Sequence, residues 1–471
     1  MAQQVVGPFT EQTAESLSKF FREPDWLTSF RLDSFRQFGS LPLEKSSLYT
    51  KYTFISQFDP NQFPLKAEKE KIDFRTFFKD YLTGKEKNIL LQGNDQEIHT
   101  DLEESLAARG VILMSLHEAI SKHESLVRGA MEHKVVTSSS DKYAAFTNAF
   151  FNSGTFVYVP KNVVLDQPLR KMLLTSEPKN SIIDQTLIVC EEGSKLVFLE
   201  ELYSRENKSE SLLASVVEID AQPTANVDFS SLQLLDDNAV YVTNKGVRAS
   251  NDSRVTASAL FLGSKITRSR MNLDMAGRGS FTEGLEIFFT GSKQRYDFES
   301  NLLHNAPDST GSIHARGTLK DESQSIFKGM IKIVNAAKNS RSYLAHHAMI
   351  MDRRAKSDGV PSLEIETNEV KATHSASVAQ VDEEQVFYLM ARGLDEDDAK
   401  RMIVLGFFEP VLSRIPIVQT REGARFIIEG KWRGERRKMP DRETLIALTG
   451  EAVPEVKQTE DIFERHYKYR K

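Results

Sequence analysis

Hydrophobic and polar positions follow two different periods along the chain, and the change of period predicts its organisation. In ESLSKFFREPDWLTSFRLDSFRQFGSLP (residues 15–42) apolar residues recur every three to four positions. This spacing predicts two amphipathic helices that are broken at Pro24, with Asp25 as the N-cap of the second. GVILMSLHEAISKHESLVRGAMEH (residues 110–133) predicts a short apolar run and then one or two more helices. The small polar stretch at residues 137–143 predicts a boundary.

Between residues 144 and 373 the helical spacing gives way to short runs with alternating polarity. FVYVP, KLVFLEE, AVYVT and LEIFFTG are typical, and Gly, Asn, Asp or Ser bounds each run. This pattern predicts many short strands. The runs show no strict repeat, which argues against a propeller and leaves a sandwich, a barrel or a solenoid. We favour a β-solenoid, because stacked coils bury one continuous core over such a length.

After His374 the helical pattern returns. VDEEQVFYLMARG (residues 381–393) has acidic residues in its first turn and ends on Gly393, a suitable residue for the C′ position. Asp395 is the expected N-cap of EDDAKRMIVLGFFEPVLSRIP (residues 396–416), whose apolar positions cover more than one side. We expect this second helix to be buried or to bind a partner. The remaining residues, which include KWRGERRKMP, predict a loosely structured basic tail.

Composition and charge restrict the class of protein. The chain has 471 residues, of which 40% are hydrophobic and 27% are charged, as in ordinary globular proteins. A net charge of -6 argues against a nucleic-acid binder. No apolar run reaches the roughly 18 residues of a membrane-crossing helix, and the first residues do not resemble a secretory signal. We therefore expect a cytoplasmic protein that binds neither membranes nor nucleic acid.

Sequence motifs for common enzyme chemistry are missing. The chain contains no P-loop, no GxGxxG after a strand, no GxSxG, no HExxH and no CxxC pair. The acid pairs Glu191–Glu192 and Glu200–Glu201 are expected in solvated turns at strand ends. A glycosidase pair would have to flank a substrate cleft. An enzyme is therefore not the first hypothesis.

The histidines and the one cysteine are the candidates for metal chemistry. His117 and His123 lie among charged residues and are expected at the surface. His346 and His347 are adjacent, so in a strand only one of them can face a given site. His374 is distinguished by its place at the exit from the last strand. Cys190, the single cysteine, is expected to pack in the core, and one thiolate is too few for a closed iron–sulfur site. Any metal would therefore sit at an interface with another subunit.

Several stretches together resemble the SufB/SufD family of iron–sulfur cluster assembly proteins. The most specific is LEIETNEVKATHSASVAQVDEEQVFYLMARGL, which is similar to the family's "DVKCSHGATVGQ-DEEQLFYLRSRG"-like segment. Further matches are EPDWLTSFRLDSF, FTNAFFNSGTFVYVPKNVVLDQPL, LIVCEEGSKLVFLEE and HNAPDSTGSIHARGTLKDESQSIFKGMIKIV. They cover most of the chain up to about residue 416.

The resemblance implies a mainly β protein, with a right-handed parallel β-helix core between helical regions. It also implies a non-enzymatic subunit of a SufBCD complex that pairs with a SufB-type paralogue or with itself through the β-helix. A SufC-type ATPase would bind the C-terminal helices and hydrolyse the ATP. No cofactor would be tightly bound to this chain alone, but iron or a nascent iron–sulfur cluster would pass through the interface. The residues expected to dock SufC are Glu384, Phe387, Tyr388, Val404, Phe407 and Phe408.

Departures from the family pattern favour the SufD-like branch. His346 stands about where SufB proteins carry an essential cysteine, and Ser375 stands where they tend to have a glutamate. His374 aligns with the SufD-type histidine that faces that cysteine, while Ala372 replaces the cysteine of the usual "CSH". The resemblance therefore implies His374 and His346 as ligands of the metal or the nascent cluster. The alternatives are a SufB-like homodimeric scaffold and, in another class, a carbohydrate-active β-helix enzyme.

These inferences divide the chain into four regions. They are an N-terminal helical region (1–143), a β-helix core (144–378), a C-terminal helical region that docks the ATPase (379–416) and the basic tail (417–471).

Overall fold

The computed structural model describes residues 4–44, 59–68, 87–176, 181–205, 210–415 and 418–435. The strands are β1 (Gln4–Gly7), β2 (Leu65–Glu68), β3 (Ile89–Gly93), β4 (Gln96–Asp101), β5 (Ile112–Ser115), β6 (Ser153–Val159), β7 (Leu169–Thr175), β8 (Ser181–Cys190), β9 (Lys195–Ser204), β10 (Ser211–Ala221), β11 (Asn226–Leu234), β12 (Ala239–Ala249), β13 (Arg254–Phe261), β14 (Ile266–Met275), β15 (Phe281–Thr290), β16 (Arg295–His304), β17 (Thr310–Leu319), β18 (Gln324–Ile333), β19 (Arg341–Ile350), β20 (Lys356–Ile365) and β21 (Lys371–Gln380). The helices are α1 (Glu11–Phe21), α2 (Asp25–Ser40), η3 (Pro60–Gln62), α4 (Glu104–Ala108), α5 (Leu116–Lys122), α6 (Glu124–Glu132), α7 (Lys142–Phe150), α8 (Glu383–Met390), α9 (Glu396–Leu412) and α10 (Val418–Trp432).

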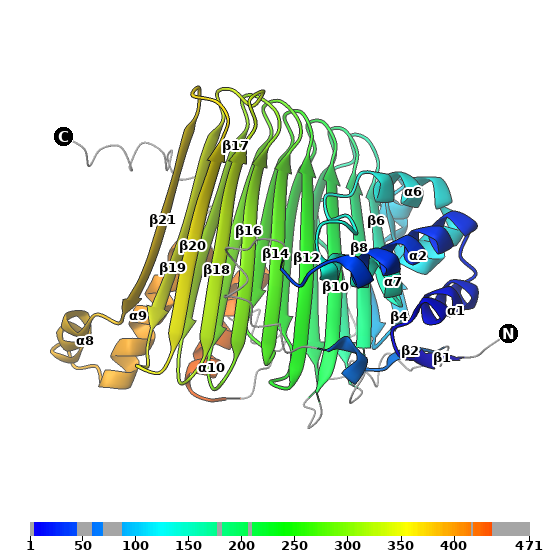
Figure 1. Cartoon of the computed structure of the whole chain (residues 1–471). Helices are drawn as coiled ribbons and strands as arrows, with labels where there is room; N and C mark the ends of the chain where they lie inside the picture. Colours follow the sequence, from blue (N-terminus) through cyan, green and yellow to red (C-terminus); the bar gives the residue numbers. More distant parts are fainter. Residues whose placement is uncertain are drawn as a thin grey trace.

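Successive strands alternate between two parallel sheets, which confirms the parallel β-solenoid (Figure 1). Sheet A runs β8-β10-β12-β14-β16-β18-β20, and sheet B runs β7-β9-β11-β13-β15-β17-β19-β21. Ile266 pairs with Arg295, which in turn pairs with Gln324, so each coil takes about 30 residues. Each coil adds one strand to each sheet. Antiparallel pairs, β1 with β2, β3 with β4 and β5 with β6, occur only near the start of the stack among the described residues.

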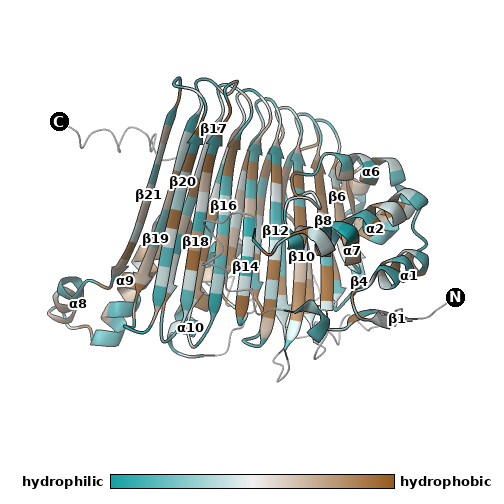
Figure 2. Ribbon diagram, in the orientation of Figure 1, coloured by the Kyte–Doolittle hydropathy of each residue, from teal (hydrophilic) through white to brown (hydrophobic). Residues whose placement is uncertain are grey.

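The core lies between the two sheets and follows from the alternating polarity of the strands. On β14, for example, Met271, Leu273 and Met275 face the interior cluster, whereas Arg270 faces outward and pairs with Asp141 at 3.1 Å. Figure 2 shows the resulting bands of hydrophobic and hydrophilic residues along the strands. A period of two places every second side chain in the core, which explains why the sequence showed short alternating runs.

One edge of the stack is held by turns that repeat from coil to coil. Asp252, Gly279, Asp308 and Asn339 all have positive φ, between 55° and 69°. The amide of each donates a hydrogen bond to a carbonyl in the turn of the next coil, as Asp308 does to Lys338 at 2.9 Å. Gly, Asn and Asp adopt this left-handed conformation at low cost. These residues are the turn signals that bounded the strands in the sequence.

The N-terminal helices cover the outer face of the first strands of sheet A. Leu17 of α1, Leu27 of α2 and Phe146 of α7 join one cluster with Val240 of β12. The guanidinium of Arg31 pairs with Glu23 and also donates to the carbonyls of residues 149 and 151, which ties α2 to the end of α7. The break between two helices before residue 25 is confirmed.

The N-terminal helical region differs from expectation in the N-cap of α2, in the exposure of His117 and in the position of its end. Asp25 is not the N-cap, because Pro24 occupies that position and Asp25 is the first helical residue. His117 is not at the surface: its ring stacks on that of Phe21 at 3.5 Å, and burial lowers its pKa to about 4. Helix α7 runs through residue 143, the expected end of the helical region. The division into domains stays a prediction.

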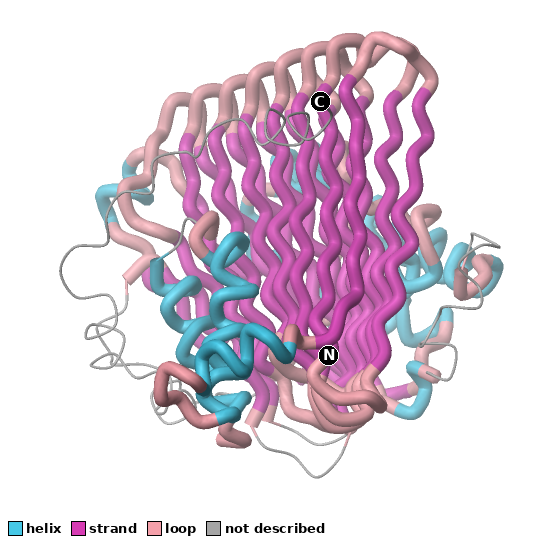
Figure 3. Tube along the Cα trace, turned by 90° about the vertical axis from the view of Figure 1, so that its left-hand side faces the viewer, coloured by secondary structure: helices cyan, strands magenta, loops and turns pink. Residues whose placement is uncertain are grey.

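The C-terminal helices α9 and α10 pack on the outer face of sheet B (Figures 1 and 3). Phe408 of α9 and Ile428 of α10 share a cluster with Leu260 and Phe289 on the strands. A loosely structured tail beginning at residue 417 is therefore wrong for residues 418–432, which form a helix. The rest of that expected tail lies outside the described residues, apart from residues 433–435.

The last coil is open. β20 and β21 each pair with one strand on one side only, among the described residues, and they end the two sheets. Most of their side chains are exposed, although the equivalent positions one coil earlier are largely buried. Nothing in the described part of the chain caps this end. The same part contains no helix that is long and apolar enough to cross a membrane.

Candidate functional site

The open last coil exposes side chains of a kind that the other coils bury. Leu363, Ile365 and Val378 are 41%, 40% and 43% exposed. Each occupies a position whose partner on the preceding strand belongs to the interior cluster, as Val378 does opposite Ala348. A solenoid normally ends in a cap with a polar outer face. This coil instead presents core-type residues and two unpaired strand edges, features that favour pairing with another strand edge.

His374 lies on this surface. It is Cα partner to Leu344, whose side chain is fully buried in the interior cluster, so the imidazole continues the inward-facing row of sheet B. Because β21 is the last strand of its sheet among the described residues, His374 is exposed. It makes no hydrogen bond within the described residues. His374 therefore lies on the last strand and is exposed, as expected, and its role as a ligand stays a prediction.

His346 lies one coil deeper and is buried. Its ring stacks on that of Phe327, with centroids 4.5 Å apart and planes at 4°. Neither ring nitrogen has a hydrogen-bond partner, and burial lowers the pKa of His346 to about 3. A Cβ atom on Gly359 would sit 3.0 Å from its Nδ1, so this imidazole fills the space that glycine leaves. Ala376 of the last strand is its Cα partner.

The two histidines are thus neighbours on one inward-facing row but occupy different coils. His347 points to the other side of β19, as the adjacency predicted, and its Nδ1 lies 2.7 Å from the hydroxyl of Ser377. In the part of the chain that the structure describes, no three His, Cys, Asp or Glu side chains come together to hold a metal ion. Cys190 is fully buried, and burial raises the pKa of its thiol.

Helix α8 forms a second exposed surface next to the open coil. The carboxylate of Asp382 caps it by accepting from the amide of Glu384 at 2.9 Å, which explains the acidic start of the segment. Phe387 and Tyr388 are 73% and 57% exposed, and Met390 is exposed as well. Large apolar side chains this exposed on a short helix are unusual unless something covers them.

The expected docking residues of α9 are placed differently. Asp395 caps the helix by accepting from the amide of Asp398 at 2.8 Å, as predicted. Val404 and Phe408, however, are buried against sheet B, and Phe407 is half-buried. The two buried side chains therefore support the fold and have no surface left for a partner. Glu384, Phe387 and Tyr388 remain available.

Both acid pairs were expected in solvated turns, and the structure confirms this for one pair and contradicts it for the other. Glu191 and Glu192 do lie in an exposed turn, where Glu192 pairs with Lys161 at 2.7 Å. Glu200 and Glu201 are instead buried in the middle of β9 and point to opposite faces. Glu200 faces the interior with Lys171 of β7.

Sequence reasoning missed the interior charges. Lys171 also pairs with Asp184 of β8 and donates to Thr186 at 2.8 Å. Further along the inside, burial lowers the pKa of Lys245 to about 8 and raises that of Glu286 to about 7. Buried charges need opposite charges or hydrogen bonds nearby. The only sequence signal was a charged residue inside an alternating apolar run, which a strand shares with many solvated positions.

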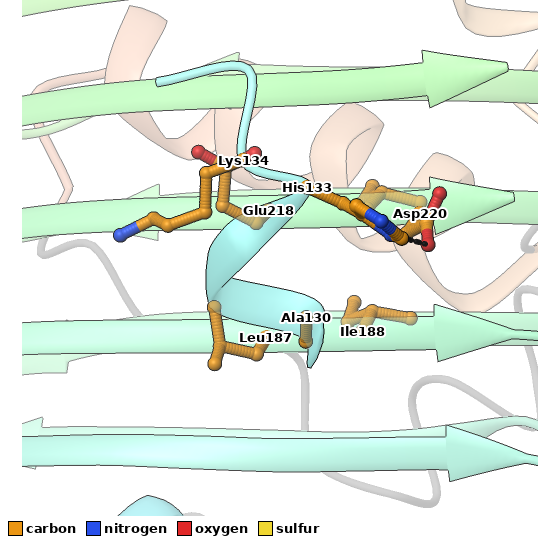
Figure 4. Close-up of a pocket in the computed structure, with 8 residues that line it drawn as sticks. Ala130, His133, Lys134, Leu187, Ile188, Glu218 and Asp220 are labelled. Carbon is orange, nitrogen blue, oxygen red and sulfur yellow. Dashed lines mark ion pairs between the residues drawn. The ribbon is translucent and has the colours of Figure 1, made fainter. Parts of the chain in front are cut away.

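A small cavity between α6, β8 and β10 holds another polar group that the sequence did not reveal (Figure 4). Glu218 accepts hydrogen bonds from the amides of Val135 and Val136, at 3.1 and 2.8 Å. His133 lies 3.7 Å from Asp220. Burial raises the pKa of Glu218 against the pull of nearby Lys134. These contacts fasten the segment after α6 to the solenoid.

The family models and the similar proteins that comparison finds all belong to the SufBD family. A family model described as "SUF system FeS cluster assembly, SufBD core domain" matches residues 173–407, and "SufBD protein N-terminal region" matches residues 11–170. Iron-sulfur cluster assembly SufBD family proteins of Staphylococcus saprophyticus and Staphylococcus haemolyticus are 27% and 28% identical over 432 residues. One from Staphylococcus aureus is also 28% identical. Each match covers 89% of this chain and 92% of the relative.

Proposed function

This chain belongs to the SufBD family of iron–sulfur cluster assembly proteins, and we propose that it is the SufD-like subunit of a SufBCD-type complex. In this role it catalyses no reaction itself. It pairs through its open last coil with a Cys-bearing SufB-type subunit, and iron or a nascent cluster is held where the two chains meet. A SufC-type ATPase binds the exposed face of α8.

The open coil is the observation that carries the proposal. A partner strand can add to the free edge of β21 through main-chain hydrogen bonds, and the exposed Leu363, Ile365 and Val378 supply apolar area to bury. The join would bring His374 into a closed, partly desolvated interface. A solenoid end that is covered in this way needs no cap of its own.

Iron is the cargo of this interface, and His374 is its first proposed ligand. A neutral imidazole suits iron, and the remaining positions would be filled by thiolate or carboxylate groups of the partner. This division of ligands agrees with the lack of a three-residue metal group in the described part of the chain. His346 lies one coil deeper, opposite Ala376 and so diagonal to His374, and its imidazole would reach the site only if the last coil moved.

The contact with the ATPase is proposed for α8, because Phe387 and Tyr388 are exposed beside the acidic Glu384. Helix α9, which follows directly, is anchored on sheet B through Phe408. A force applied to α8 would therefore reach both β21, which precedes α8 in the chain, and the strands of sheet B on which α9 packs. Such coupling requires the ATPase to bind the two arrangements of the interface with different affinity.

Two alternatives make different predictions. A homodimeric SufB-like scaffold would use the same open coil but would have no Cys-bearing partner. Its weak point is His346, which stands where SufB proteins carry an essential cysteine. A carbohydrate-active enzyme would need a surface pair of acids, whereas Glu200 and Glu201 are buried on opposite faces of β9.

The experiment is anaerobic purification from the native host, followed by native mass spectrometry and metal analysis. We expect a complex with an ATPase and a Cys-bearing sister subunit. His374→Ala should leave assembly intact and reduce the cluster yield, while the neighbouring Thr373→Ala serves as the matched control on the same strand. A lone monomer without ATPase or iron would contradict the proposal, and a homodimer with the ATPase would favour the scaffold alternative.

A further inference from the structure

A group of basic and aromatic side chains lies on the outer face of sheet B, between the end of α9 and the last coil. His314 and Arg316 are two residues apart on β17, so they share a face. On the neighbouring β19, Tyr343 and His347 share that face too, and register places Arg316 opposite His347. The rings of His314 and Tyr343 have centroids 5.4 Å apart.

Small residues occupy the middle of this group. Ala345 is the Cα partner of His314, and on β21 the partner of Ala345 is Ser375. Cross-strand partners lie about 5 Å apart. His314, Tyr343 and His347 therefore flank Ala345, which carries only a methyl group, and Ser375 lies beyond Ala345 on the edge strand. The group, His314, Arg316, Tyr343, His347 and Ser377, is called the outer basic site below.

The charge at the outer basic site is positive and only partly neutralised. Arg414, at the end of α9, pairs with Glu283 of β15. Arg316 has no carboxylate within 4.0 Å among the described residues; its guanidinium donates to the carbonyl of Phe407 and lies 5.0 Å from that ring. Burial, together with the guanidinium groups of Arg414 and Arg316 and the imidazole of His347, lowers the pKa of His314 to about 3. His314 is thus neutral at physiological pH, beside an unneutralised cation.

One polar atom at the site is left without a partner. Nε2 of His314 is buried and makes no hydrogen bond. Such atoms are uncommon, because an unpaired buried polar group costs roughly 1–3 kcal/mol. A neutral imidazole can donate one N–H, as can the hydroxyls that line the site. The nitrogen of His314 and the guanidinium of Arg316 are therefore suited to the same kind of group.

We propose that the outer basic site binds a small oxyanion, a phosphate or a carboxylate, between Arg316 and the two imidazoles of His314 and His347. The oxyanion accepts hydrogen bonds from these side chains and neutralises Arg316. A metal cation is disfavoured, since two guanidinium groups stand next to the imidazoles. The site faces outward, so it is separate from the inward-facing row of His346 and His374. The inference does not depend on the proposed function.

The test uses the full chain with isotope-labelled histidine. Imidazole NMR signals of His314 and His347, assigned through the His314→Gln and His347→Gln variants, are followed during titration with inorganic phosphate, phenyl phosphate or malonate at constant chloride. We expect saturable shifts of these two signals. Response to both phosphates points to a phosphoryl ligand, and response to malonate alone points to a carboxylate, for example of a partner's side chain.

Variants decide whether the binding belongs to this site. Arg316→Gln should weaken it about tenfold, because a hydrogen bond to a charged group is lost. Arg278→Gln, at an exposed turn where Arg278 pairs with Asp308 at 2.8 Å, removes the same charge and should change nothing. Since Arg316 also holds α9, His347→Gln is the second variant and should weaken binding about threefold.

Three results would overturn the proposal. They are the absence of saturable shifts at His314 and His347, binding that survives both Arg316→Gln and His347→Gln, and a site that takes Zn²⁺ while ignoring all three anions. None of these results bears on the complex with SufB-type and SufC-type partners, which is measured by mass spectrometry. The two proposals can therefore fail independently.

Discussion

Single buried side chains determine how this solenoid responds to acid. His346 is enclosed by Phe327 and the last coil, and burial lowers its pKa from 6.5 to about 3. The folded state thus has the lower pKa, so this group's contribution to stability is complete above pH 6.5. It is lost as the pH falls from 6.5 toward 3, because the unfolded chain takes up the proton first. His304, whose pKa is also lowered to about 3, acts in the same direction.

We expect His346→Phe to reduce the acid sensitivity of the fold. Below pH 6.5 each such histidine removes about 1.4 kcal/mol of unfolding free energy per pH unit. The phenyl ring preserves the stack on Phe327 without the titrating group. Urea unfolding at about pH 7.5 and pH 5.5 should therefore show a smaller loss for the variant than for the wild type. A Leu344→Val control should lose equal stability at both pH values, and an unchanged pH dependence in His346→Phe would contradict this account.

At the scale of residues the sequence predicted placement better than environment. His374 was located on the last strand and His347 on the opposite face to His346, because strand periodicity settles both. His117 and Glu200 were expected at the surface, yet the side chain of His117 is only 15% exposed and Glu200 is buried. Their partners, Glu23 and Lys171, come from elements that only the fold brings near. The local pattern of polar and apolar residues does not predict ion pairs between distant parts of the sequence.

The helices differ in how clearly the sequence marks them. Helix α9 begins at Glu396, as its N-cap predicted, and ends at Leu412, within the expected segment 396–416. Helix α10 was missed because its basic residues indicated a solvated tail. In the structure the amine of Lys431 donates to the carbonyls of residues 262 and 289, and Trp432 donates to Asp397 at 3.0 Å. These basic and polar groups act as anchors of a packed helix.

The two faces of the C-terminal helices should respond differently to substitution. Phe387→Ser removes an exposed side chain, so stability should change by less than about 0.5 kcal/mol, while affinity for the ATPase subunit should fall about tenfold. Phe408→Ala, one helix later, empties a buried position and should cost about 3–5 kcal/mol. Chemical unfolding and a pull-down of the co-expressed ATPase measure the two effects. Normal ATPase binding by Phe387→Ser would remove α8 from the interface.

For the whole molecule, the uncapped end is the main consequence of the stack. A free, regular strand edge with core-type side chains tends to pair with another edge. In the absence of another partner, the isolated chain should therefore associate with itself. The fold class was predictable from strand periodicity, but the open end was not, because no local pattern distinguishes the last coil from the one before it.

We expect Val378→Lys to weaken this self-association about tenfold, since it would bury an unpaired ammonium group. Val164→Lys is the matched control: Val164 is 42% exposed, like Val378 at 43%, but lies in a loop away from the last coil. Sedimentation equilibrium over a range of concentrations measures both. A wild-type chain that stays monomeric throughout would show that this edge requires a different protein.

Helices α9 and α10 have a mechanical consequence. In a solenoid each coil touches only its neighbours, so the ends can fray while the middle stays folded. These two helices lie against strands of sheet B from β11 to β17, and Arg316 of β17 donates to the carbonyl of Phe407 on α9. The two helices therefore connect coils that would otherwise contact only their immediate neighbours. A force applied at the C-terminal end is thereby distributed over several coils at once. We expect these coils to separate together rather than one at a time.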